Sequence, residues 1–214
     1  TLLAKLLGTI LIFKLFSEEG AFGIHKRAIT WSWSIIWYGI IPILAGLIFV
    51  YFFLYLEKVF TKLESWKLSP IFKAILWGLV LSSLTLITDH ALFSGEFHIV
   101  PLSKTALSYS SLFLLVIALV KTLSILGWRG GKIFPPIFAS VAIGAAIAQC
   151  IPIQPVITVF LTVAASITII LKNILTVILL IFLLPIYLAP LIFIAAYLVM
   201  LLYKFIFRKV KLSF

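Results

Sequence analysis

The chain has 214 residues, of which 64% are hydrophobic and only 11% are charged, and its formal net charge is +11. A soluble domain carries about 25% charged residues, so this composition excludes a soluble globular protein and predicts a chain solvated by lipid. The single cysteine, Cys150, argues against a disulfide framework or a thiolate metal site, and we expect it as a small apolar residue within a helix.

The charges are distributed unevenly along the chain. Residues 97–214 contain nine Lys or Arg and no acidic residue. In a chain with membrane spans, this excess indicates positive loops and snorkelling side chains rather than a nucleic-acid partner. It also suits a path for anions. The basic tail at residues 208–211 predicts a cytoplasmic C-terminus.

The apolar segments in the first part of the chain predict membrane helices. Residues 1–16 look like the second part of such a helix, and we expect the sequence to be a fragment of a longer protein. Three longer spans follow, separated by a charged connection at 57–68 and a polar, turn-like connection at 89–101. These spans are expected at residues 31–56, 70–88 and 102–126.

The later segments are shorter than the roughly 20 residues that a full crossing needs. Each is bounded by Pro or Gly, which predicts tilted or broken helices whose ends meet inside the membrane, as at transporter binding sites. They comprise residues 134–148, 156–171 and 174–184, and a last helix is expected at 191–207. The expected fold class is therefore an all-α, polytopic membrane protein.

Residues 127–136 form a glycine-rich, basic loop that ends in two prolines, Pro135 and Pro136. Irregular backbone at membrane depth is costly unless it lines a cavity or is buried in protein. A helix that starts just after Gly131 would aim its free N–H groups at whatever occupies that cavity. The loop therefore predicts an anion site. The alternative is a tight interhelical turn whose cations, Arg129 and Lys132, snorkel to the interface.

Other clusters of polar residues give weaker evidence for a functional site. Asp89, His90, Glu96 and His98 lie close together, but their spacing matches no metal site, and a solvated loop is favoured over a metal site or a proton relay. The sequence has no catalytic triad, Walker loop or dinucleotide fingerprint. We therefore expect no enzyme activity, no cofactor and no metal.

The loop resembles the helix start Gly-x-Phe-x-Pro of the ClC chloride channel and transporter family. Phe134 and Pro136 fall on the family's Phe and Pro, while Lys132 replaces its Gly. Lys121 falls on the basic position in the preceding helix. Weaker matches lie at residues 93–96, 142–146 and 171–176, where Asn173 and Ile174 replace the family's Ala-Pro.

This resemblance implies the ClC-type inverted-repeat fold, with short, tilted and broken helices. The 214 residues would form one transmembrane domain that covers the end of the first repeat and most of the second. Residues 1–66 would be the last helices of the first repeat, and residues 67–214 would form the second. The resemblance also implies a multi-pass protein, placed in the plasma membrane, and a homodimer in which the span around Gly46 and the last two helices face the second subunit.

For function, the resemblance implies transport of chloride or a related halide across the bilayer. The backbone N–H groups of Ile133 and Phe134 would face the anion, with the Phe134 ring narrowing the path. Gly131 would allow close approach, and Pro136 would complete the helix start. Two further expectations concern the basic residues: Arg129 and Lys132 attract anions to the mouth, and Lys121 either snorkels or lines a vestibule.

The alternative function is a structural or accessory membrane protein that keeps the fold without transport, which the loss of the Ala-Pro turn would fit. The sequence leaves open a channel or a proton-coupled exchanger, and chloride or fluoride as the anion. The family's gating Glu belongs to a segment that precedes Thr1.

Overall fold

The computed structural model describes residues 32–64, 69–89, 102, 106–126, 134–171 and 189–209. These residues form helices and short connections, with no strand among them, which confirms the all-α prediction. The helices are α2 (Ser34–Tyr38), α3 (Ile40–Glu64), α4 (Pro70–Thr85), the 3-10 turn η3 (Ala106–Ser108), α6 (Ser111–Leu126), α7 (Phe134–Ala148), α8 (Pro155–Leu171) and α10 (Ala189–Lys209).

The two short helices at the centre of the chain agree closely with their predictions. α7 has 15 residues and the bounds expected from its Gly and Pro neighbours. α8 has 17 residues and begins at Pro155, one residue earlier than expected. Proline is well suited to the first position of a helix because that position needs no N–H. The helix expected at 174–184 lies outside the described residues.

Two predicted boundaries were wrong. The charged connection expected at 57–68 is helical as far as Glu64, because charged side chains do not interrupt α3. Within this part of the helix the hydroxyl of Thr61 donates to the carbonyl of Glu57 at 2.8 Å. The span expected from residue 102 begins only at Ser111. There Ser110 starts the helix, since its side-chain oxygen accepts a bond from the Phe113 N–H at 3.3 Å.

Within the described part of the chain, the 29-residue stretch Ser34–Lys62 is long and apolar enough to cross a bilayer, and its most apolar 18 residues have a mean hydropathy of 2.4. The apolar parts of the other described helices are shorter, with 10–17 residues each. Apolar stretches of this length fall short of the roughly 20 residues that cross a hydrocarbon core about 30 Å thick, although α10 as a whole has 21 residues.

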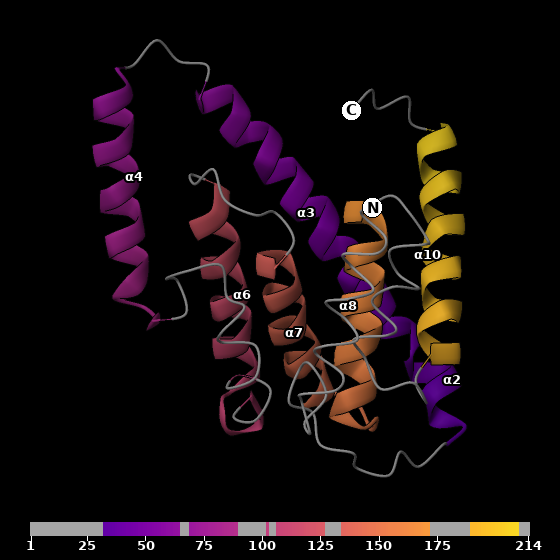
Figure 1. Ribbon diagram of the computed structural model, residues 1–214. Coiled ribbons are helices and arrows are strands. Elements are labelled where there is room, and N and C mark those ends of the chain that lie inside the picture. The colour runs from indigo at the N-terminus through magenta and orange to yellow at the C-terminus, as the bar shows by residue number, and fades with distance from the viewer. Residues whose placement is uncertain are drawn as a thin grey trace, which may run out of the picture.

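The helices pack around α7 and α8 (Figure 1). α7 lies between α6 and α8, and α8 also contacts α3 and α10. α3 crosses this row of helices diagonally. α4 stands at the edge and has no buried residue. It is held in part by the ring of Trp77, whose centroid lies 5.0 Å from that of Phe60 on α3.

Two glycines let three backbones approach closely at the centre. A Cβ on Gly46 of α3 would lie 2.6 Å from the carbonyl oxygen of Thr162 on α8. A Cβ on Gly144 of α7 would lie 2.6 Å from the Cα of Val159, also on α8. Small residues at such crossings are the usual means of helix packing in membranes. Gly78 on α4, by contrast, has no atom within 4 Å of its Cβ position.

α8 buries polar side chains without needing partners on other helices. The hydroxyls of Thr162, Ser166 and Thr168 each donate to the carbonyl four residues earlier, at 2.9, 2.8 and 2.6 Å. These side chains are fully buried. Because the donors are satisfied within the helix, the polar groups are compatible with an apolar core. The hydroxyl of Ser166 also lies 3.4 Å from the carbonyl oxygen of Gly46 on α3.

Candidate functional site

The first residue of α7 differs sharply from those that follow it. The side chain of Phe134 is 44% exposed, whereas Pro135 and Pro136 are buried. The first turn is fixed by the prolines and by Ser140, whose hydroxyl donates to the carbonyl of Pro136 at 2.7 Å. The helix that follows is buried through Ala142, so α7 is anchored in the bundle and presents Phe134 at its end.

The two prolines determine which amides are available at this end. The first four N–H groups of a helix have no partner within the helix, but proline has no N–H. In α7 this leaves Phe134 and Ile137 as amide donors among the first four residues. Ile137 is only 3% exposed. Of these two residues Phe134 is the exposed one, and the positive end of the helix dipole lies at the same end.

Three of the predicted site residues fall within the described part of the chain. Phe134 and Pro136 lie in the first turn of α7, and Lys121 lies on α6. The remaining predicted residues lie outside the described residues, so their positions relative to the helix start stay predictions. They are Arg129, Gly131, Lys132 and Ile133.

Lys121 does not snorkel to the surface, so that expectation was wrong. Its side chain is 0% exposed, and its ammonium lies 5.5 Å from the ring centroid of Phe138 on α7. α7 covers the face of α6 that carries this residue, which is why a position near a helix end does not lead to solvent. Phe138 lies one turn beyond Phe134, so the buried cation is adjacent to the first half of α7.

Gln149, which the sequence analysis did not single out, fixes the other end of α7. Its amide nitrogen donates to the carbonyl of Tyr109 at 2.7 Å and lies 3.4 Å from that of Ala106, and its amide oxygen accepts from the Ser111 hydroxyl at 2.7 Å. These bonds join the end of α7 to the start of α6. The two helices therefore run antiparallel, and Lys121 lies toward the opposite end, where α7 begins. A polar residue between an apolar segment and Pro152 was the available signal.

The structure also describes two residues from the other predictions, Cys150 and Asp89. Cys150 is exposed in the turn after α7 rather than within a helix, because α7 ends at Ala148. Asp89 is exposed just beyond α4, and His90, Glu96 and His98 lie outside the described residues. Across the described ranges, no three His, Cys, Asp or Glu side chains form a group that could hold a metal ion.

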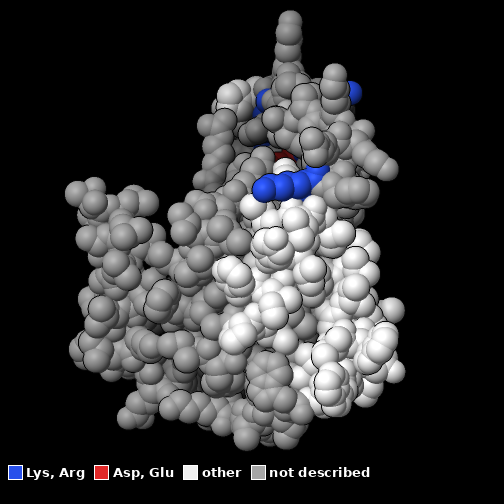
Figure 2. Space-filling view, turned by 90° about the vertical axis from the view of Figure 1, so that its right-hand side faces the viewer, with Lys and Arg blue, Asp and Glu red and all other residues white. Residues whose placement is uncertain are grey.

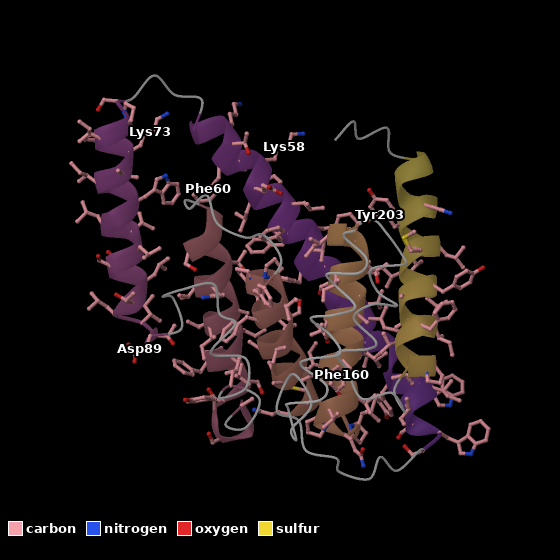
Figure 3. The ribbon with its side chains drawn as sticks, in the orientation of Figure 1. Lys58, Phe60, Lys73, Asp89, Phe160 and Tyr203 are labelled. Carbon is pink, nitrogen blue, oxygen red and sulfur yellow. The ribbon has the colours of Figure 1, made fainter. Side chains whose placement is uncertain are left out.

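Figure 3 shows how charges are placed at the ends of the bundle. Lys58 near the end of α3 and Lys73 near the start of α4 lie at one end, and Asp89 lies at the opposite end of α4. Lys62, in the last turn of α3, and Lys204, near the end of α10, are both exposed. Basic residues at helix ends are typical of membrane helices.

Comparison with known protein families identifies the chain. Residues 1–203 match the family described as voltage gated chloride channel. No curated protein and no solved structure gives a significant match. The family match covers the described helices except the last six residues of α10, which accounts for their apolar composition and makes this an integral membrane protein with the ClC fold. Its general function is chloride transport. The chain therefore belongs to the voltage-gated chloride channel (ClC) family.

Proposed function

We propose that this protein moves chloride or a related halide along a path that passes the N-terminus of α7. The observation that carries the proposal is the placement of Phe134, the exposed first residue of an otherwise buried helix. An anion that has lost water needs partial positive charge, but not so much that it is trapped. Free amides at a helix start and the helix dipole supply that charge.

The proposed site combines the helix start with the loop before it. The N–H groups of Phe134 and Ile133 face the anion, Gly131 lets the backbone approach, and Pro136 fixes the turn. The prolines support this arrangement, since they leave the donors concentrated at the very start of the helix. Arg129 and Lys132 raise the local anion concentration at the mouth.

The experiment is chloride efflux from liposomes that contain the purified full-length protein. Phe134→Ala should change the efflux rate or the selectivity among halides, because the ring borders the path. Phe72→Ala on α4 is the matched control, since Phe72 is also a phenylalanine and is 51% exposed, against 44% for Phe134. Equal rates and selectivity for Phe134→Ala and wild type, with both proteins correctly assembled, would contradict the proposed site.

The accessory-protein alternative has its own outcome in the same assay. A wild-type protein that is folded and inserted, yet gives no chloride efflux, would favour a structural role for the fold. The efflux of wild type thus tests transport itself, while the Phe134 variant tests the location of the path.

We also propose that the protein is a homodimer. α10 exposes a row of apolar side chains. On the side of the molecule shown in Figure 2, the described surface is uncharged over most of its area. In the span around Gly46, Gly46 itself faces α8, since a Cβ there would lie 2.6 Å from the carbonyl oxygen of Thr162. The exposed face of α10 is therefore the proposed contact. Light scattering of the detergent-solubilised protein should give the mass of two chains, and a monomer would refute the proposal.

The orientation in the membrane and the division of the chain into two repeats are also proposals. We propose that the ends of α3 and α10 face the cytoplasm of a plasma-membrane protein, since exposed Lys62 and Lys204 lie near them and cytoplasmic ends carry the basic excess. Residues 1–66 and 67–214 are proposed as parts of the first and second repeats. Protease protection of a C-terminal tag in sealed, right-side-out vesicles tests the orientation, and cleavage from outside would reverse it.

A further inference from the structure

Lys121 occupies a core position of α6. The helix buries a stripe at helical spacing that contains Leu114, Ile117, Ala118 and Lys121. The opposite face exposes Leu115 and other apolar residues. A lysine in this stripe places a unit positive charge in the core of the bundle. The neighbouring buried polar groups on α6, the hydroxyls of Thr122 and Ser124, donate to carbonyls of their own helix at 2.7 and 2.9 Å. Ionisable residues inside membrane helices are costly to bury and are associated with ion pathways.

Two contacts between α6 and α7, one at each end of the pair, show where this charge lies along α7. Gln149 is bonded to Ser111 at one end of the α6–α7 pair, and Lys121 lies over Phe138 near the other. Phe138 follows Phe134 by four residues, which is about 6 Å of helix rise. With 5.5 Å from the ammonium to the Phe138 ring centroid, the charge lies on the order of 10 Å from the first residue of α7.

The charge and the helix start act in the same direction on an anion. The dipole of α7 places partial positive charge at Phe134. The Lys121 ammonium, which lies by the ring of Phe138 one turn further along α7, adds to this positive charge. The two positive groups repel each other, and an anion at the helix start is attracted by both. Phe138 is fully buried and its ring lies beside the ammonium. The cation therefore attracts the anion through space without providing a contact that would trap it.

We infer that Lys121 is a specificity-determining residue for transport, a buried charge that sets the affinity of the α7 helix start for a monovalent halide. This inference rests on the proposed function. At an effective dielectric constant of about 20, a unit charge about 10 Å away changes the affinity for a monovalent anion by about tenfold. The basic groups of the loop would act at the mouth, whereas Lys121 acts from within the bundle.

The test measures how chloride flux depends on chloride concentration in liposomes that contain the full-length protein. Lys121→Met keeps most of the side-chain volume and removes the charge, and it should raise the half-saturating chloride concentration about tenfold. Lys121→Arg keeps the charge and should remain close to wild type. Lys204→Met removes a charge from an exposed lysine on α10 and should leave the half-saturating concentration unchanged.

A purely structural role for Lys121 would lower the amount of folded protein or the maximal flux, but not the half-saturating concentration. Thermal unfolding of each variant is measured alongside. If Lys121→Met does not fold, Lys121→Gln replaces it, and the same rise is expected. A folded neutral variant with the wild-type half-saturating concentration would overturn the inference and leave the proposed function intact. Absence of chloride flux in wild type would overturn both.

Discussion

The crossing of α7 and α8 should be the most sensitive contact in the molecule, and Gly144→Ala tests it. The added Cβ would lie 2.6 Å from the Cα of Val159 and 3.2 Å from the hydroxyl of Thr162. The first distance falls 0.8 Å short of the 3.4 Å at which ordinary contact begins. Because the nearest atom belongs to a backbone, it cannot rotate away, and the two helices must separate.

The size of the effect follows from two opposing terms. Overpacking of a well-packed core costs about 1–3 kcal/mol. Alanine is also a better helix former than glycine by about 1 kcal/mol, which offsets part of this cost. Gly78→Ala on α4 separates the two terms, since Gly78 lies within a helix and has open space at its Cβ position. The difference between the two variants is then the cost of the clash alone.

The assay is thermal unfolding of the two purified variants in the same detergent. About 1 kcal/mol shifts the melting temperature of a chain of this size by about 2–4 °C. Gly144→Ala should therefore melt several degrees below Gly78→Ala, and its chloride efflux should fall because α7 carries the proposed site. Equal melting temperatures for the two variants would refute the close packing of α7 on α8.

Two further predictions concern the ends of helices. Gln149→Ala removes the bonds that join the end of α7 to α6, and because these bonds are exposed it should destabilise the protein by about 0.5–1.5 kcal/mol in thermal unfolding. Gln149→Glu should be worse than Gln149→Ala, since a carboxylate oxygen replaces the donor opposite the Tyr109 carbonyl; a neutral effect of both would refute the role of these bonds. Trp33 and Trp37 are 82% and 78% exposed, so replacing both with Phe should reduce fluorescence quenching by lipids with brominated chains. Trp77→Phe, at a ring packed on Phe60, should reduce it less, and the reverse order would contradict a lipid-facing α2.

Backbone chemistry explains which helices could be predicted from the sequence. α7 and α8 were located almost to the residue, because glycine and proline act on the local backbone whatever surrounds it. The end of α3 was misplaced for the opposite reason. Charged residues at positions 57–64 indicate contact with water, but they do not interrupt a helix, and the next helix breaker along the chain is Pro70. The point at which the helix passes from lipid to water was thus interpreted as the end of the helix.

The environment of Lys121 could be predicted only in part. A lysine five residues before the end of α6 resembles a snorkelling side chain. Its spacing from Leu114, Ile117 and Ala118 nevertheless places it on the buried face of the helix, and that periodicity was present in the sequence. The sequence does not show that α7 covers this face of α6. Such a contact depends on how two helices cross, which local propensity does not determine.

The burial of α7 links stability to transport and decides which variants are informative. Residues from Pro135 to Ala142 are all buried, so a substitution there changes packing and any pathway at the helix start together. Phe134 is exposed at the same end, and its replacement should leave the packing of α7 largely unchanged. A transport defect in Phe134→Ala without a change in melting temperature therefore assigns the effect to the path itself. A defect that appears only in Gly144→Ala, together with a lower melting temperature, assigns it to the placement of the helix.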